Sequence, residues 1–248
     1  MRTTDILLLT FLLAGAAASV RWKKLTPMAA ATGVLLGWAI YAGAGWLGML
    51  LLALFFITGT AATSWKKKDK LLIRGSAAHE PTRGPGQVIA NAGVAALLGG
   101  GAFFYPTRTP LFLLMLAASL ASATADTLSS ELGLVYGRRC YNILTGKKDE
   151  RGLDGVISIE GLFIGAAGSA LIAAVYGLGT VLWAAPAHHP GLPLQLIIIT
   201  LAGVAGNLTD SLLGALFERR GYLSNNAVNF LNTLLAATFA GACTGFHS

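Results

Sequence analysis

The segment 110–127, PLFLLMLAASLASATADT, decides the fold of this chain. It is rich in leucine and alanine and runs without a charged residue up to Asp126. About 20 apolar residues, each rising 1.5 Å, are enough for an α-helix to cross the hydrocarbon core of a bilayer. A membrane-embedded β-strand would instead alternate apolar and polar residues. The segment therefore predicts a membrane-spanning helix with a carboxylate near one end.

The same apolar pattern recurs along the whole chain. Its 248 residues are 54% hydrophobic and only 12% charged, with a mean hydropathy of +0.65. Soluble proteins carry about 25% charged residues, and a soluble fold of this length could not bury so much apolar surface. The composition predicts an all-α, polytopic transmembrane helix bundle, built as a single integral membrane domain over residues 1–248. About eight spans are expected, at residues 4–20, 27–42, 45–62, 88–105, 110–127, 157–184, 194–216 and 227–245.

Lysine and arginine are distributed unevenly between the two sets of loops. If all eight spans cross, 16 of the 18 basic residues fall on one side of the membrane, and only Arg2 and Arg108 fall on the other. Basic residues concentrate in cytoplasmic loops. The asymmetry predicts that both termini lie outside. The loops expected in the cytoplasm are 63–87, 134–156 and 217–225.

Glycine is abundant, with 31 residues, and small residues let membrane helices approach closely. Spans two and three are separated only by Gly43 and Ala44. These two spans therefore form either a tight hairpin or one broken helix, and the sequence leaves both arrangements open.

The basic loops give the chain a net charge of +7. Membrane topology and contact with anionic lipid headgroups account for this charge. The lipid bilayer is thus an expected partner, and nucleic acid is not. The lysine run 66–70 is interpreted in the same way, as a topology signal. The two cysteines, Cys140 and Cys243, are far apart and predict neither a disulfide nor a metal site.

The 11 acidic residues are the main candidates for chemistry. Ten of them lie on the cytoplasmic side or at cytoplasmic helix ends, and the exception is Asp5. Carboxylates inside or at the edge of a span are costly and therefore suggest function. Asp126 and Glu131 follow an apolar run, where the dipole at a helix C-terminus opposes negative charge. They are five residues apart, about 140° around a helix, so they share a face only if the helix ends between them.

A polar segment leads into the fourth span. Arg83 precedes its Gly-Pro-Gly turn, from which a guanidinium could grip a phosphate with two hydrogen bonds. Gln87 and Asn91 follow, four residues apart and thus on one helical face. A capped helix start with an arginine that reaches the interface is the equally open structural interpretation.

The segment before span six contains Asp154, in an Asp-Gly turn, and Ser158. Its central charged run, 147–151, is interpreted as solvated. In span seven, Asn207 and Asp210 are three residues apart on one face, and an aspartate within a span suggests function by default. In span eight, three asparagines repeat on one face, for which interhelical hydrogen bonding is the open alternative; they are Asn225, Asn229 and Asn232.

These segments resemble the DUF92/TMEM19 family of integral membrane proteins. The segments are 84–93 (GPGQVIANAG), 125–133 (ADTLSSELG), 152–158 (GLDGVIS), 206–215 (GNLTDSLLGA) and 223–232 (LSNNAVNFLN). The resemblance covers nearly the whole chain, and the motifs occur in family order. The plant chloroplast member of that family is a phytyl-phosphate kinase that serves tocopherol synthesis.

The resemblance implies Mg²⁺-dependent phosphoryl transfer from a nucleoside triphosphate, CTP or ATP, to a prenyl or phytyl monophosphate at the cytoplasmic interface. The product would be the diphosphate. The residues expected to act as catalytic groups and to hold Mg²⁺ are Asp126, Glu131, Asp154 and Asp210. Those expected to bind the substrate and the nucleotide are Arg83, Gln87, Asn91, Ser130, Lys148, Arg151, Ser158, Asn207, Ser211 and Asn229. The acceptor is already an ionised phosphate, so no strong general base is required.

Two other functions stay open at this point. A transporter or flippase for a lipid phosphate would line a pathway with polar groups at the midplane and reach both membrane faces. A CDP-lipid-type transferase would use similar carboxylates and form a different product. A scaffold without catalysis would not need an aspartate inside span seven.

Overall fold

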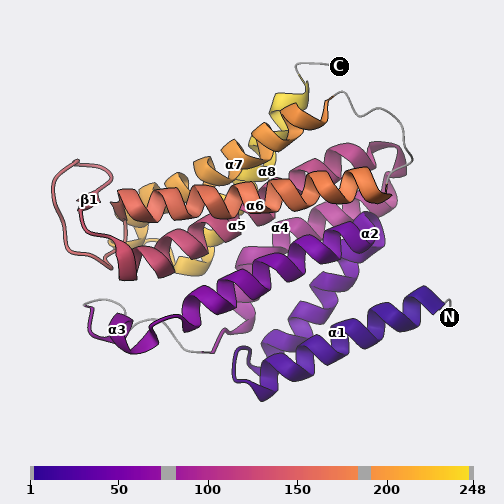
Figure 1. The fold of residues 1–248 in the computed structure, drawn as a ribbon, viewed down its shortest axis with the longest axis horizontal. Helices are drawn as coiled ribbons and strands as arrows, with labels where there is room; N and C mark the ends of the chain where they lie inside the picture. The colour runs from indigo at the N-terminus through magenta and orange to yellow at the C-terminus, as the bar shows by residue number, and fades with distance from the viewer. Residues whose placement is uncertain (1–2, 74–81, 184–190, 246–248) are drawn as a thin grey trace.

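The computed structural model describes residues 3–73, 82–183 and 191–245, which form a helical bundle with one small sheet (Figure 1). Seven of the described helices are long and apolar enough to cross a membrane. The predicted class, a polytopic helix bundle, is therefore confirmed. In chain order the elements are α1 (Thr3–Arg21), α2 (Pro27–Ser64), α3 (Lys67–Leu71), α4 (Pro85–Phe104), the 3₁₀ turn η2 (Pro106–Arg108), α5 (Thr109–Tyr136), β1 (Cys140–Asn142), β2 (Val156–Ser158), α6 (Ile159–Trp183), α7 (Leu192–Leu213), the π-helical turn η3 (Gly214–Glu218) and α8 (Asn225–Gly245).

Helix α2 is a hairpin of two membrane-length segments. Its 38 residues would extend about 57 Å if the helix were straight. Instead, Gly45 leaves the helical region with φ 56° and ψ −149°, and the chain reverses there (Figure 1). Lys24, just before α2, donates from Nζ to the hydroxyl of Ser64, the last residue of α2, at 2.7 Å. The seven described helices thus contain eight segments of membrane-spanning length, and the expected spans two and three form a hairpin.

Glycines near this hairpin let α2 approach α4 closely. A Cβ atom at Gly43 would overlap the carbonyl oxygen of Gly99 and would lie 2.7 Å from the Cβ of Ala102. By contrast, the ideal Cβ position at Gly33, in the first half of α2, has no neighbour within 4 Å among the described residues. The two glycines therefore differ in packing although both belong to the same helix.

Gly43→Ala is expected to lower the unfolding temperature, because the added methyl group forces α2 and α4 apart at a cost of about 1–3 kcal/mol. Gly33→Ala is the matched control. It should be neutral or stabilise the protein by up to about 1 kcal/mol, since alanine is the better helix former. Thermal unfolding in detergent compares the two variants. Equal unfolding temperatures would contradict the close approach of α2 and α4.

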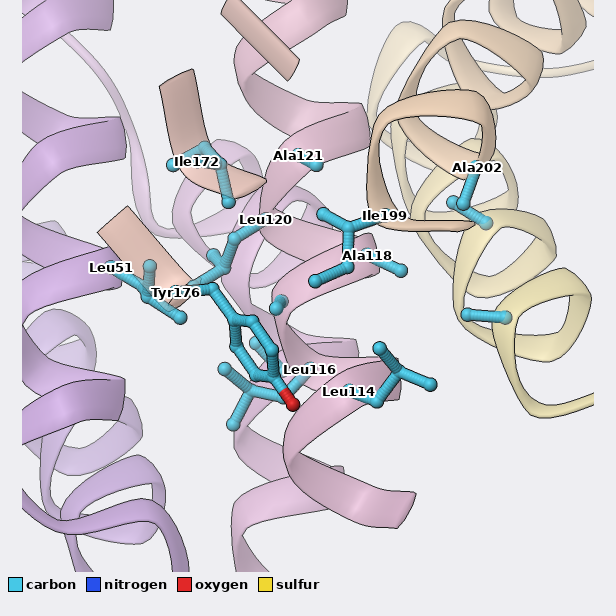
Figure 2. Packing of buried hydrophobic residues seen from close by; sticks show 14 of the residues in the cluster. Leu51, Leu114, Leu116, Ala118, Leu120, Ala121, Ile172, Tyr176, Ile199 and Ala202 are labelled. Carbon is cyan, nitrogen blue, oxygen red and sulfur yellow. The ribbon is translucent and has the colours of Figure 1, made fainter. Parts of the chain in front are cut away.

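Helix α5 is the centre of the bundle. It packs against α2, α4, α6, α7 and α8. Its fully buried Leu116 and Leu120 belong to an apolar cluster that also contains Leu51, Ile172 and Ile199 (Figure 2). Much of the remaining buried surface of α5 is alanine and serine, which allows neighbouring helices to come close. Because five helices pack on α5, the side chains at its polar end have well-defined surroundings.

The polar connections gather at one end of the bundle. In Figure 1, α3 and β1 lie at this end, and the start of α1 and the end of α8 lie away from it. Strands β1 and β2 pair antiparallel, with Cys140 opposite Ser158, so a small sheet occupies part of the expected loop 134–156. Helix α3 lies within the expected loop 63–87. That this end faces the cytoplasm stays a prediction.

The end of α5 differs from the expectation. The apolar run predicted a span ending near Thr127, but the helix continues to Tyr136. Asp126 and Glu131 therefore lie on one continuous helix and cannot share a face. The helix continues because its polar last turns pack against other elements of the bundle instead of ending in water.

Candidate active site at the polar end of the bundle

A pocket of about 290 Å³ opens among the helix ends that carry the polar segments. Its lining comes from the end of α2, the starts of α4 and α8, the end of α5, α7 with η3, and the segment that contains β2. Every predicted site residue except Lys148 lines this pocket. These residues are Arg83, Gln87, Asn91, Asp126, Ser130, Glu131, Arg151, Asp154, Ser158, Asn207, Asp210, Ser211 and Asn229. Segments far apart in the sequence thus meet in one place.

Two aspartates from neighbouring helices meet in this pocket. The carboxyl group of Asp126, on α5, lies against that of Asp210, on α7, and the two groups interact. Asn232, on α8, donates from Nδ2 to Oδ1 of Asp210 at 2.7 Å, and its own Oδ1 accepts from the hydroxyl of Ser122 at 3.0 Å. This buried chain of contacts orients Asp210. Two carboxylates so close repel each other unless a proton or a cation lies between their oxygens.

A further acidic side chain, Glu218, lines the pocket and was not among the site residues predicted from the sequence. It is the last residue of η3. On a regular α-helix, a residue eight positions after Asp210 would lie about 80° around the axis. The π-turn, with its i→i+5 hydrogen bonds, holds an extra residue per turn and rotates Glu218 back toward Asp210. Its carboxylate lies near the side chain of Asn225 and near the carboxylates of Asp154 and Asp210.

Glu131 is paired with a lysine and not with the aspartates. Its Oε2 lies 2.6 Å from Nζ of Lys70 on α3, and both side chains are buried. Lys70 also donates to the carbonyl oxygen of Ala62 at 2.6 Å. The angle of about 140° between positions 126 and 131 on a helix explains why the two carboxylates have different partners. Lys70, interpreted from the sequence as part of a topology signal, instead anchors α3 to α5.

Lys70→Met is expected to destabilise the protein by about 3–5 kcal/mol, because Glu131 is then buried without its cation. The double variant Lys70→Met/Glu131→Gln should recover most of that loss, since no unpaired charge remains. Lys68→Met changes an exposed lysine on the same short helix and serves as the control. The measurement is thermal unfolding in detergent. If the Lys70→Met protein is as stable as the Lys68→Met protein, the buried ion pair does not stabilise the fold.

Arg83 brings a positive charge to the α2 and α4 side of the pocket. Its backbone N–H donates to the carbonyl oxygen of Lys24 at 3.0 Å. Its Nη2 donates to the hydroxyl of Thr63 on α2 at 3.3 Å. Burial lowers the pKa of Arg83 below its ordinary value, but an arginine stays protonated at neutral pH. Because Lys24 also lines the pocket, this side is basic.

The side-chain amides at the starts of α4 and α8 differ in how completely they are hydrogen-bonded. Gln87 accepts through Oε1 from the N–H of Gly84 at 3.1 Å and caps α4, and Asn91 donates to the carbonyl oxygen of Gln87 at 2.8 Å. Asn229 donates to Asn225, but its Oδ1 is buried without a hydrogen-bond partner among the described residues. A buried oxygen in this state costs free energy until a donor or cation meets it. Asn229 is therefore the amide best suited to meet a ligand.

The predicted serines make local hydrogen bonds at the pocket wall. Ser158 accepts from the N–H of Gly161 at 3.0 Å. Ser130 and Ser211 donate to backbone carbonyl oxygens about one turn earlier, at 3.2 and 3.3 Å. Asn207 also lines the pocket and is nearly fully buried. Their contribution to ligand binding stays a prediction.

Lys148 is the predicted site residue that lies elsewhere. It lines an adjoining cavity of about 370 Å³. Arg151 borders both cavities, and its Nη1 donates to the carbonyl oxygen of Gly137 at 2.9 Å. The fold of the segment around β1 places Lys148 outside the main pocket, which the sequence could not show.

The acidic side of the pocket suits a cation that arrives together with a phosphate. In residues 3–73, 82–183 and 191–245, no group of three or more His, Cys, Asp or Glu side chains is placed to hold a metal ion. The expected set of four carboxylates is therefore not assembled, and Glu131 is occupied by Lys70. The Asp126–Asp210 pair remains. Mg²⁺ in phosphate-handling sites commonly takes one or two carboxylates, several waters and the phosphates themselves, so this pair fits Mg²⁺.

Fold and pocket together define an integral membrane protein with a charged site where its helix ends meet. The chain belongs to the DUF92 family of integral membrane proteins, whose profile matches residues 9–237. The resemblance inferred from the sequence motifs is thereby confirmed.

Three relatives illustrate the family. The chain is 33% identical to "Uncharacterized membrane protein sll0875" of Synechocystis sp., over 95% of this chain and 88% of that protein. It is 32% identical to "Protein VTE6, chloroplastic" of Arabidopsis thaliana, over 85% of this chain and 62% of that protein. It is 34% identical to "Uncharacterized membrane protein MJ0933" of Methanocaldococcus jannaschii, over 81% of this chain and 78% of that protein. No solved structure matches the chain.

Proposed function

We propose that this protein transfers the terminal phosphoryl group of a nucleoside triphosphate to a prenyl or phytyl monophosphate. An oxygen of the acceptor phosphate attacks the γ-phosphorus, and the bond from the γ-phosphorus to the β–γ bridging oxygen breaks. The products are the prenyl diphosphate and the nucleoside diphosphate. Because the attacking oxygen is already ionised, no protein group has to remove a proton.

The observation that carries the proposal is a pocket whose lining combines carboxylates and cations from different elements. Asp126 of α5, Asp210 of α7 and Glu218 of η3 are among its carboxylates, and Arg83 and Lys24, next to the starts of α4 and α2, are among its cations. A lipid phosphate keeps its chain in the bilayer and its head at the interface, while a nucleotide arrives from water. Helix ends at the membrane surface are therefore where both substrates can meet.

Both kinds of group have a role in the proposed complex. Arg83 binds the acceptor phosphate through two N–H donors, a geometry that a guanidinium favours. Asp126 and Asp210 bind the cation that accompanies the triphosphate, and Asn232 keeps Asp210 oriented. Mg²⁺ bound there would neutralise charge on the phosphate oxygens. The free Oδ1 of Asn229 offers one more oxygen to that assembly.

Two observations favour the kinase over the alternatives. The motifs resemble a family whose plant chloroplast member is a phytyl-phosphate kinase, which supports the choice of acceptor. The polar lining comes from one end of the bundle, whereas a transport pathway would carry polar groups through the midplane to the other face. A CDP-lipid-type transferase would use a similar carboxylate pair, so the by-product must distinguish the two enzymes.

The by-product identifies the reaction. With Mg²⁺ and phytyl or geranylgeranyl monophosphate, the purified protein in detergent is expected to convert CTP or ATP to the nucleoside diphosphate, in equal amount with the prenyl diphosphate. Release of pyrophosphate would instead identify nucleotidyl transfer. Consumption of neither substrate by folded protein would contradict the proposal.

A further inference from the structure

The cavity of about 370 Å³ beside the active-site pocket is lined mainly by cations. Its four basic residues are Arg138, Arg139, Lys148 and Arg151. The two neighbouring arginines follow the end of α5. Lys148 reaches the same space because its backbone bridges to Tyr141 of β1. We call this space the cationic cavity.

Asp149 is the acidic residue of the lining, and its charge is already paired. Its Oδ2 accepts from Nη1 of Arg219 at 2.8 Å and from Nδ2 of Asn142 at 3.2 Å. Hydrogen bonds from Arg219, from the backbone of Glu150 and from Asn142 lower the pKa of Asp149 to about 2. The group is thus ionised at neutral pH and bound to an arginine outside the lining. Glu160 also lies near Arg138 and Arg139 but outside the lining. The four cations outnumber the carboxylate of the lining, and such an arrangement attracts an anion.

The cationic cavity adjoins the proposed active site. Cys140 and Arg151 line both spaces. Arg151 is held at this junction by its hydrogen bond to the carbonyl oxygen of Gly137. A nucleoside triphosphate whose terminal phosphate reaches the Asp126–Asp210 pair must direct its other phosphates and its nucleoside toward water. The junction at Arg151 offers a path lined by positive charge.

We propose that the cationic cavity binds the phosphates nearest the nucleoside of the donor triphosphate, while the terminal phosphate enters the active-site pocket. This inference rests on the proposed function, since it specifies where the donor of that reaction binds. Arg138, Arg139 and Lys148 contact these phosphates, and Arg151 lies between them and the transferred group. The basic side of the active-site pocket, at Arg83, is then left to the acceptor.

A phospholipid headgroup offers the same phosphate chemistry as a nucleotide. The nucleotide is the favoured source because the cavity shares lining residues with the active-site pocket. The segment around β1 also extends beyond the helix ends, away from the bundle (Figure 1). A cavity placed there faces the compartment from which a soluble nucleotide arrives.

Nucleotide affinity without any acceptor tests the inference. Arg139→Gln and Lys148→Gln are each expected to raise the Kd for CTP and ATP by about tenfold or more, since hydrogen bonds to charged groups are lost. The affinity for inorganic tripolyphosphate, which lacks a nucleoside, should fall in parallel. Lys147→Gln is the matched control, because this exposed neighbour lines neither cavity. Unchanged nucleotide affinity in both variants, with phosphoryl transfer intact in the wild type, would overturn the inference and leave the proposed function standing.

Thiol labelling gives a second readout with an internal control. Both cysteines are free, and Cys140 lies at the junction while Cys243 lies near the end of α8. Burial raises the pKa of the Cys140 thiol, so labelling by a maleimide belongs in mildly alkaline buffer. Nucleotide should slow labelling of Cys140 and leave Cys243 unaffected.

Nanodiscs of phosphatidylcholine, with and without phosphatidylglycerol, distinguish the two phosphate sources. Protection of Cys140 by nucleotide in the neutral nanodiscs is the expected result. Protection by phosphatidylglycerol alone would assign the cavity to a lipid headgroup and overturn the inference. Nucleotide binding that weakens in the variants, without any phosphoryl transfer by the wild type, would support this site and contradict the proposed reaction.

Discussion

Asp210→Asn is expected to lower the kcat of phosphoryl transfer by about a thousand-fold, the scale seen when one preorganised electrostatic group is removed from a transition state. Asparagine keeps the size of the side chain and can still contact Asn232, which donates to Asp210 at 2.7 Å. It loses the negative charge that lies against Asp126. Since the two aspartates are proposed to hold one cation, Asp126→Asn should have a similar effect, and both variants should require more Mg²⁺ for half-maximal rate.

The control for Asp210→Asn is Asp69→Asn, the same chemical change on an exposed residue of α3. It should leave turnover unchanged. Unfolding temperature and yield in detergent establish that the Asp210→Asn protein is folded. If that variant has the wild-type kcat and needs no more Mg²⁺ for half-maximal rate, Asp210 is not part of the catalytic site.

Arg83→Gln is expected to raise the KM for the prenyl monophosphate by about a hundred-fold, because a charge-assisted interaction worth about 1.5–3 kcal/mol is lost. The KM for the nucleotide should change much less. Arg83→Lys should restore only part of the affinity, since an ammonium cannot form the two parallel hydrogen bonds of a guanidinium. Steady-state kinetics with each substrate varied in turn separates these effects.

Arg220→Gln is the matched control, because Arg220 is exposed and does not line the pocket. The backbone contacts of Arg83 with Lys24 and Thr26 do not depend on its side chain, so the start of α2 should stay in place. A raised KM for the nucleotide with an unchanged KM for the acceptor would show that Arg83 binds the nucleotide. That result would contradict the proposed role of Arg83 in binding the acceptor phosphate.

Hydropathy was sufficient to predict the membrane segments because each had to be apolar over the thickness of the bilayer. It could not locate the end of α5. Polar residues after Asp126 resemble a helix end in a hydropathy plot, but Glu131 is neutralised by Lys70 and the helix continues to Tyr136. The reversal in α2 was left open for a related reason. It depends on the backbone angles of Gly45 and on contacts such as that of Lys24 with Ser64, which hydropathy does not reveal.

The candidate site could be predicted in outline because alternate helix ends must lie at the same membrane face. Its pairings could not be predicted. Glu218 depends on a π-turn that periodicity counts do not detect, and Lys70 acquires its partner only when α3 packs against α5. Asn232 lay in the noted asparagine stripe, yet its contact with Asp210 required the α7–α8 packing. Lys148 was expected to bind the substrate or the nucleotide, and the sequence could not show that it lines an adjoining cavity, because the chain direction around β1 was unknown.

The most direct test of the proposed kinase is transfer of label from γ-labelled CTP or ATP to phytyl monophosphate by the purified protein in detergent, with the Asp210→Asn protein as the blank. Labelled phytyl diphosphate is expected in the presence of Mg²⁺, none after chelation by EDTA, and none above background in the blank. Absence of labelled diphosphate with both nucleotides and with phytyl and geranylgeranyl acceptors, from protein shown by thermal unfolding to be folded, would contradict the proposed kinase.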